Sequence, residues 1–198
     1  MIWFIVGAFG GYLLGSIPFG LLITRIAGLG DIRQIGSGNI GATNVLRTGR
    51  KDLALATLVL DSFKAGLAVL ILTMVSGDRN VGLIAGAFAF LGHCYPIWLG
   101  FKGGKGVATY AGLLAFASPL ALAVGAPIWL GLFALTRISS LAALTAAAFV
   151  PIGAFLLGET RFAAFTLLAL SVLVFWTHRA NIKRLLNGTE PKFGSKSK

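Results

Sequence analysis

The chain has 198 residues, of which 57% are hydrophobic and only 12% are charged, and its formal net charge is +11. Because an average soluble domain carries about 25% charged residues, this composition excludes a water-soluble globular protein and favours an integral membrane protein. The positive charge does not indicate a nucleic-acid partner, because the lysines and arginines lie in short segments between long apolar blocks.

The apolar blocks recur along the whole chain. They cover residues 3–23, 53–75, 81–99, 107–135, 138–157 and 162–177. A helix needs about 20 apolar residues to cross a bilayer core of about 30 Å, so each block predicts at least one span. No Lys or Arg precedes Arg25, so we expect a first span rather than a cleavable signal peptide. The sequence therefore predicts an all-α polytopic membrane protein with a single domain, residues 1–198, and a basic disordered tail at about residues 192–198.

The basic residues predict the orientation of these spans. Most of the 17 Lys and Arg residues lie after the first block, between the 81–99 and 107–135 blocks, at Arg137 and in the tail. Cytoplasmic loops are enriched in Lys and Arg, so these segments should share the cytoplasmic side. The 107–135 block must then cross twice, and Pro119 marks the break because proline suits the first turn of a helix. We predict seven spans, a short one at residues 104–118, the amino terminus outside and the carboxyl terminus in the cytoplasm.

The first polar segment is GSGNIGATNVLR, residues 36–47. Glycine lets a backbone approach a ligand closely, and successive free N–H groups form concavities that bind anions. Arg47 adds a planar guanidinium that suits phosphate oxygens. We interpret the segment as a phosphate-binding loop rather than a solvated connection between helices. Its glycines match the pattern GxGxxG, but membrane spans flank them in place of a βαβ unit, which excludes a dinucleotide site.

The second polar segment is GFKGGKGVAT, residues 100–109. Lys102 and Lys105 stand among Gly103, Gly104 and Gly106 at the head of an apolar helix, and helix N-termini attract anions. A Walker A loop requires Ser or Thr after the Gly-Lys pair, and Gly106 stands there instead. The segment therefore predicts a phosphate clamp and does not support nucleotide hydrolysis.

The third polar segment, residues 178–190, begins where the last apolar block ends. Its Arg179 and Lys183 are ordinary for a membrane exit, where long basic side chains reach toward the headgroups. His178 and Asn181 are three residues apart, which places them near one face of a helix. We single out this pair as candidate site residues.

Asp61 and Lys64 lie within the second apolar block, three residues apart. An intramembrane ion pair is costly and marks either function or a structural strut, and we favour the strut. His93 and Tyr95 are interpreted as packing and hydrogen-bonding residues. The chain has only six Asp and Glu residues, and none in the predicted cytoplasmic loops are spaced as a local metal motif. Cys94 is the only cysteine, which excludes an internal disulfide.

Together the three segments resemble the bacterial acyl-phosphate:glycerol-3-phosphate acyltransferase family. The resemblance runs from about residue 12 to residue 185 and includes HRxNIxRL at residues 178–185. One departure is that Ala65 follows Lys64, where the family has DxxKG. The resemblance implies transfer of a fatty acyl group from acyl phosphate to the 1-hydroxyl of glycerol 3-phosphate, the first step of phospholipid synthesis. The products are lysophosphatidic acid and phosphate.

The resemblance also implies a place and partners. The enzyme would have seven spans and an active site at the cytoplasmic face of a bacterial inner membrane. It would be a monomer that uses acyl phosphate, glycerol 3-phosphate and membrane lipids, with no metal, nucleotide or other cofactor.

The resemblance assigns site residues by motif position. The catalytic set is Ser37, Lys105, His178 and Asn181. The substrate-binding set is Gly38, Asn39, Gly41, Thr43, Asn44, Arg47, Lys102, Gly103 and Gly104. In our interpretation the donor's own phosphate accepts the glycerol proton, and the alternative is His178 as general base. Two other classes stay open: a transporter of a phosphorylated solute, which an intramembrane ion pair would suit, and a lipid-binding scaffold, which would explain only the basic tail.

Overall fold

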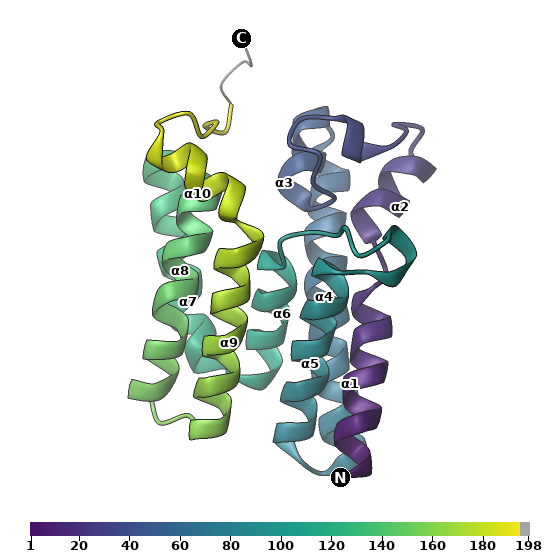
Figure 1. The fold of residues 1–198 in the computed structure, drawn as a ribbon, viewed down its shortest axis with the longest axis vertical. Coiled ribbons are helices and arrows are strands. Elements are labelled where there is room, and N and C mark those ends of the chain that lie inside the picture. Colours follow the sequence, from purple (N-terminus) through teal and green to yellow (C-terminus); the bar gives the residue numbers. More distant parts are fainter. Residues whose placement is uncertain (195–198) are drawn as a thin grey trace. The chain divides into compact units, whose positions relative to one another are not determined.

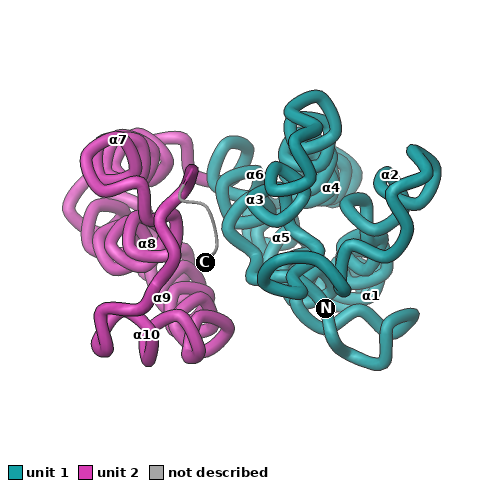
Figure 2. The backbone as a smooth tube through the Cα atoms, turned by 90° about the horizontal axis from the view of Figure 1, so that it is seen from above, with its two compact units in different colours: residues 1–117 teal, residues 118–198 magenta. Residues whose placement is uncertain are grey.

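The computed structural model describes residues 1–194, and every regular element in that range is a helix (Figure 1). The predicted all-α class is therefore confirmed. The chain forms two compact units, residues 1–117 and the part from Ser118 onward (Figure 2). Each unit has its own packing and is described separately.

Unit 1 contains six α-helices and three short 3-10 helices. The α-helices are α1 (Ile2–Gly15), α2 (Phe19–Ile26), α3 (Ala42–Val45), α4 (Lys51–Ser76), α5 (Arg79–Cys94) and α6 (Val107–Ala117). The 3-10 helices are η1 (Ile32–Gln34), η2 (Leu46–Thr48) and η3 (Ile97–Leu99). Unit 2 contains α7 (Pro119–Thr136), α8 (Ser139–Leu156), α9 (Arg161–Thr177) and α10 (Arg179–Leu186).

Several of these helices can cross a membrane. Within residues 1–194, five segments are long and apolar enough: Ile2–Ile26, Lys51–Ser76, Arg79–Leu99, Pro119–Thr136 and Ser139–Leu156. The α9–α10 pair, bent by 62°, is a sixth candidate. Helix α6 is apolar but has only 11 residues. A polytopic membrane fold is thus confirmed, whereas the count of seven spans requires α6 as a short crossing and stays a prediction.

The predicted break inside the 107–135 block is confirmed. Helix α6 ends at Ala117 and α7 begins at Pro119, with Ser118 as its N-cap residue. The expected start of the first half near residue 104 was wrong, because Gly106 has φ +82° and leaves the helix to begin at Val107.

The predicted apolar block 81–99 is helical only as far as Cys94. Tyr95 precedes Pro96 and has φ −132° and ψ 60°, and a residue before proline is disfavoured in the helical region. The remaining residues of the block form η3 and turn the chain toward the second polar segment.

Glycines allow the helices of unit 1 to pack at very short distances. A Cβ atom on Gly15 of α1 would overlap the backbone of Ala89 in α5. A Cβ atom on Gly112 of α6 would overlap the backbone of Ser62 in α4. In lipid there is no hydrophobic force between helices, so close van der Waals contact through small residues supplies much of their association. These contacts position α5 and α6, which flank the second polar segment.

The polar segments of unit 1 gather at one end of its helices. Figure 1 shows α2, α3 and the α5–α6 connection on the side of unit 1 away from the turn between α4 and α5. A small core fastens the first polar segment to this end, and it consists of the buried residues Leu21, Ile32, Ile40, Val45 and Ala54. The expectation that both glycine-rich segments lie on one side is therefore met within unit 1.

In unit 2, the α7–α8 turn and the segment after α10 are joined. The Phe193 N–H donates to the Arg137 carbonyl at 2.7 Å, and the Phe133 and Phe193 rings are 5.9 Å apart. This agrees with the prediction that Arg137 and the tail share a side. Phe193 falls inside the range predicted to be disordered, and it is held by these contacts; residues 195–198 of that range lie outside the described residues.

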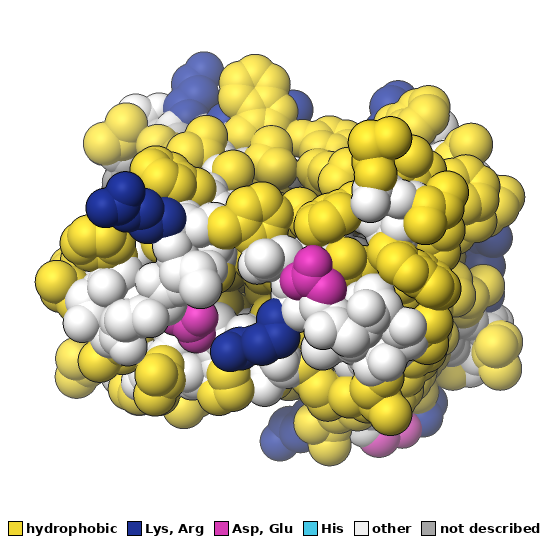
Figure 3. Space-filling model, turned by 90° about the horizontal axis from the view of Figure 1, so that it is seen from below, with side chains coloured by type: hydrophobic (Ala, Val, Ile, Leu, Met, Phe, Trp, Pro, Cys, Tyr) yellow, Lys and Arg dark blue, Asp and Glu magenta, His cyan; other side chains and the backbone are white. Residues whose placement is uncertain are grey.

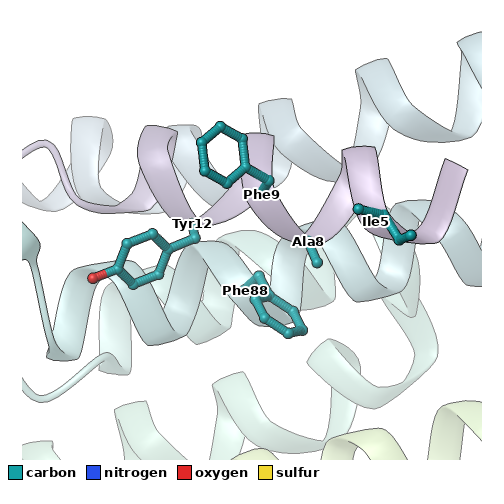
Figure 4. A pocket seen from close by; sticks show the side chains of 5 residues that line it. All are labelled: Ile5, Ala8, Phe9, Tyr12 and Phe88. Carbon is teal, nitrogen blue, oxygen red and sulfur yellow. The ribbon is translucent and has the colours of Figure 1, made fainter. Parts of the chain in front are cut away.

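Many large apolar side chains along the helices are exposed, among them Phe9, Leu55 and Phe165. Figure 3, which views the molecule from below the orientation of Figure 1, shows hydrophobic side chains with some charged ones among them. A cavity of about 370 Å³ on unit 1 is lined by Ile5, Ala8, Phe9, Tyr12 and Phe88 of α1 and α5 (Figure 4). The Tyr12 hydroxyl donates to the Tyr95 carbonyl at 2.8 Å. Because the cavity offers no charged group, it does not suit a phosphate, and the site is sought in the polar segments.

Candidate active site

The first loop, residues 36–47, folds around the side chain of Asn44. Asn44 is 2% exposed, and its Oδ1 accepts from the Ser37 N–H at 3.0 Å. Its Nδ2, which carries two hydrogens, lies 2.8–3.0 Å from the carbonyls of Ile32, Ile35 and Asn39, so one N–H is shared between two acceptors. A buried amide that joins the loop to the residues just before it specifies the loop's shape. Asn44, which the resemblance assigned to the substrate, is thus buried, and its side chain supports the loop from within.

The backbone amides of the first loop are largely used within it. Gly38 N–H donates to the Ile35 carbonyl at 3.1 Å, and Gly41 N–H donates to Asn39 Oδ1 at 2.8 Å. Gly36 and Gly38 have φ of +58° and +70°, a backbone region that favours glycine. The N–H groups of Ser37, Gly38 and Gly41 are thus not free for a ligand, because the tight turns use these donors. The exposed polar groups on this loop are side chains, Thr43 among them.

Arg47 lies over the start of the first loop. A Cβ atom on Gly36 would come 2.9 Å from Arg47 Cδ and 3.1 Å from its Nη1, so the guanidinium reaches the residue next to Ser37. Both Ser37 and Arg47 are exposed. The Ser37 hydroxyl lies 3.3 Å from Asn44 Oδ1, and a planar guanidinium next to this turn suits a phosphate group.

Arg47 differs from its neighbours in charge pairing. Arg33 and Arg50 form ion pairs at 2.6 Å with Asp31 and Asp52. Hydrogen bonds from the Arg33 guanidinium hold the pKa of Asp31 well below its usual range. Arg47 has no ion pair among residues 1–194. The structure thus leaves the arginine predicted for the substrate available to an external anion.

The second loop, residues 100–106, is packed on the end of α5. Gly103 N–H donates to the Cys94 carbonyl and Gly104 N–H to the His93 carbonyl, both at 3.0 Å. A Cβ atom on Gly103 would overlap the His93 carbonyl, and one on Gly104 would overlap the His93 ring. Both glycines were predicted to contact substrate. The structure shows that they let the loop lie directly against α5, with their N–H groups bonded there.

The charges of the second loop come from two lysines. Lys102 is exposed and has no ion pair within residues 1–194, whereas Lys105 is half-buried and interacts with the protein. The loop ends at Gly106, where α6 begins. Thr109, in the first turn of α6, has a fully buried hydroxyl without a hydrogen-bond partner in residues 1–194. Sequence reasoning did not single out Thr109, although a hydroxyl in a first helical turn is a recognisable signal.

His178 and Asn181 lie at the bend between α9 and α10. His178 is 3% exposed, and its Nδ1 is 2.8 Å from the Val174 carbonyl, which can only accept. Asn181 is 5% exposed and donates through Nδ2 to Glu190 Oε1 at 2.6 Å. Both predicted residues are therefore held in fixed orientations by unit 2.

Glu190 holds three donors of unit 2 together. Besides Asn181, it accepts from Ser140 Oγ and Arg184 Nε, both at 2.7 Å. Desolvation raises its pKa, but the hydrogen bonds from Ser140, Asn181 and Arg184 outweigh it and leave the pKa of Glu190 below its usual value. Sequence reasoning missed this role, because nothing local marks a carboxylate whose partners come from α8 and α10.

Replacing Glu190 with Gln should lower the thermal unfolding midpoint at pH 7 by roughly 4 °C, since a hydrogen bond to a charged group contributes about 1.5 kcal/mol. A carboxyl with a lowered folded pKa stabilises the fold above its unfolded pKa of about 4.3, and this contribution is lost as pH falls through the folded pKa. The two proteins should therefore converge in acid. Midpoints measured in detergent between pH 7 and pH 3 test this, and equal midpoints at pH 7 would remove the assigned role.

The structure brings the predicted residues together in two sets. Ser37, Arg47 and the lysines of the second loop belong to unit 1, whereas His178 and Asn181 belong to unit 2. Within residues 1–194, no group of three His, Cys, Asp or Glu side chains could hold a metal ion. The proposition that both sets bind the same substrates stays a prediction.

Comparisons with known proteins agree with this arrangement of apolar helices and cationic loops. Residues 5–188 match the family model described as glycerol-3-phosphate acyltransferase. The chain is 70% identical to the glycerol-3-phosphate acyltransferase of Hyphomonas neptunium, over 98% of this chain and 94% of that protein. It is 60% identical to that of Maricaulis maris, over 97% and 88%.

Solved structures show the same fold. The chain is 39% identical to the integral membrane glycerol 3-phosphate acyltransferase PlsY in its glycerol 3-phosphate form, with a TM-score of 0.90 over 96% of both chains. The lysophosphatidic acid form of PlsY matches with 38% identity and a TM-score of 0.88, over 96% of this chain and 95% of that one. The fold is thus that of an integral membrane acyltransferase. The chain belongs to the glycerol-3-phosphate acyltransferase family.

Proposed function

We propose that this enzyme transfers a fatty acyl group from acyl phosphate to the sn-1 hydroxyl of glycerol 3-phosphate, giving lysophosphatidic acid and phosphate. This is the first step of phospholipid biosynthesis. The proposal rests on the similarity to PlsY, whose solved forms are named for glycerol 3-phosphate and lysophosphatidic acid. The enzyme acts as a monomer with seven spans, α6 being the short one, and its active site faces the cytoplasm at a bacterial inner membrane.

The cationic side chains of the two loops of unit 1 support the binding of two phosphorylated substrates. Acyl phosphate and glycerol 3-phosphate repel each other, and Arg47, Lys102 and Lys105 offset that repulsion when both are bound. Holding the hydroxyl oxygen against the acyl carbonyl carbon then supplies much of the rate acceleration. Phosphate is a good leaving group, so the enzyme needs no covalent intermediate.

The hydrogen bond of His178 Nδ1 bears on which group can accept the proton of the glycerol 3-phosphate hydroxyl. Because the Val174 carbonyl can only accept, Nδ1 of His178 donates to it, and a neutral His178 therefore has its lone pair on Nε2. That nitrogen is chemically able to accept the glycerol proton. We nevertheless favour the donor's own phosphate as the acceptor, with Ser37, His178 and Asn181 orienting the reacting groups.

Purified enzyme reconstituted in vesicles should release phosphate only when acyl phosphate and glycerol 3-phosphate are both present. Lysophosphatidic acid should form in an equal amount. Glycerol in place of glycerol 3-phosphate is the control and should give no more than the rate without enzyme, since the cations need an anionic acceptor. Entry of labelled glycerol 3-phosphate without any acyl donor would instead indicate a transporter.

A further inference from the structure

A buried polar network lies between the two loops of unit 1. It consists of Asp61 and Lys64 of α4 and His93 of α5, whose side chains are at most 4% exposed. Lys64 Nζ donates to Asp61 Oδ1 at 2.8 Å and lies 3.0 Å from His93 Nδ1. An ion pair within a membrane span is costly, and retaining one requires a structural or functional reason.

Hydrogen-bond chemistry fixes the roles in this network. An ammonium group has three N–H donors and no acceptor. Lys64 Nζ has three partners: Asp61 Oδ1, His93 Nδ1 and the Ile17 carbonyl, the last at 2.8 Å. With Lys64 charged, His93 Nδ1 accepts, which places the proton of a neutral imidazole on Nε2. His93 Nδ1 also lies 3.5 Å from Asp61 Oδ1, so the network links one cation, one anion and one ring.

One arm of the network reaches the second loop. The edge of the His93 ring that carries Nε2 lies against Gly104, where a Cβ atom would overlap it. The His93 and Cys94 carbonyls accept the N–H groups of Gly104 and Gly103. The orientation of His93 thus determines where the loop that carries Lys102 and Lys105 rests.

The other arm reaches the first loop through the break between α1 and α2. Ile17 lies in this break, and its carbonyl is the third partner of Lys64. Three residues later, Gly20 packs so closely on the Ile40 carbonyl of the first loop that a Cβ atom would overlap it. Lys64 is therefore bonded to the segment on which the first loop rests.

We propose that Asp61, Lys64 and His93 form a positioning network that holds the two cationic loops of unit 1 in the geometry that binds both substrates. The three residues touch no substrate and act through Gly104 and Ile17. The inference rests on the proposed acyltransferase function, and it assigns these residues to catalytic efficiency rather than only to helix association.

A double variant separates positioning from stability. In Asp61→Leu/Lys64→Met, apolar side chains of similar volume replace the ion pair, an exchange that commonly preserves or raises stability. We expect the thermal unfolding midpoint to stay near that of the parent enzyme while kcat/KM falls about 100-fold, the effect of misplacing reacting groups by about 1 Å. If the three residues served only to hold the helices together, the folded double variant would keep the kcat/KM of the parent enzyme.

A second variant keeps the test decisive if the double variant does not fold. His93→Asn retains the ion pair and offers Lys64 an oxygen acceptor, but it withdraws the ring from Gly104. We expect kcat/KM to fall at least tenfold, consistent with a partial loss of positioning. The buried Cys94 thiol should also react faster with a maleimide below the unfolding midpoint. Without the His93 ring against Gly104, the second loop covers the end of α5 less tightly.

Two controls make the outcomes distinguishable. Thr145→Val removes an intramembrane hydroxyl that bonds only within α8, to the Leu141 carbonyl, and should leave kcat/KM and Cys94 reactivity unchanged. The parent enzyme must first form lysophosphatidic acid from acyl phosphate; if it does not, the proposed function itself fails. If the parent is active and His93→Asn matches it in both kcat/KM and Cys94 reactivity, the positioning network is overturned.

Discussion

Replacing Arg47 with Ala should reduce kcat/KM about 1000-fold while leaving the thermal unfolding midpoint within about 2 °C of the parent enzyme. Arg47 is exposed and has no ion pair within residues 1–194, so its removal breaks no ion pair of the described fold. Its side chain lies close to Gly36, the residue before Ser37, and a guanidinium can offer two N–H groups to one phosphate. Steady-state rates in micelles at saturating acyl phosphate, together with a melting curve, test both parts.

Two related variants define the origin of that loss. Arg50→Ala removes the same charge three residues away, but Arg50 is paired with exposed Asp52, so its rate should stay within about twofold because surface pairs contribute little. Arg47→Lys keeps the charge but loses the planar fork, and it should recover only part of the activity. If Arg47→Ala and Arg50→Ala were equally active, Arg47 would have no special role at the phosphate.

Local features of the sequence predicted the parts of the fold that depend on local chemistry. The apolar blocks predicted the spans because the lipid environment dictates their composition and length. Pro119 predicted the break in the 107–135 block because the consequence of proline is confined to its own turn. The cationic loops were likewise visible, since Arg47, Lys102 and Lys105 lie within short polar segments.

The contacts that shape the site could not be predicted in this way, because they join residues that are distant in sequence. Glu190 bonds Asn181 nine residues away and Ser140 fifty residues away. Lys64 reaches His93 across 29 residues and Ile17 across 47.

In the first loop, even contacts between residues close in sequence could not be predicted. The composition of this segment predicted free amides, whereas the backbone turns around Asn44 use several of them. Composition shows which donors are present, and only the fold shows which donors remain for a ligand.

Gly15→Ala should destabilise the enzyme by about 3 kcal/mol, although it adds a single methyl group. A Cβ atom at this position would overlap the backbone of Ala89, and backbone atoms of a packed helix cannot rotate away as a side chain does. Helices α1 and α5 would have to separate, which would also weaken the hydrogen bond that the Tyr12 hydroxyl donates to the Tyr95 carbonyl. Because α5 carries the second loop, activity should fall together with stability.

Gly10→Ala is the matched control in the same helix. A Cβ atom on Gly10 would meet nothing within 4 Å, and alanine is about 1 kcal/mol better than glycine inside a helix. Its thermal midpoint should therefore equal or exceed that of the parent enzyme, while Gly15→Ala unfolds at a clearly lower temperature. Equal midpoints for the two variants would show that α1 and α5 tolerate separation, and that backbone contact at Gly15 does not position the loop end of α5.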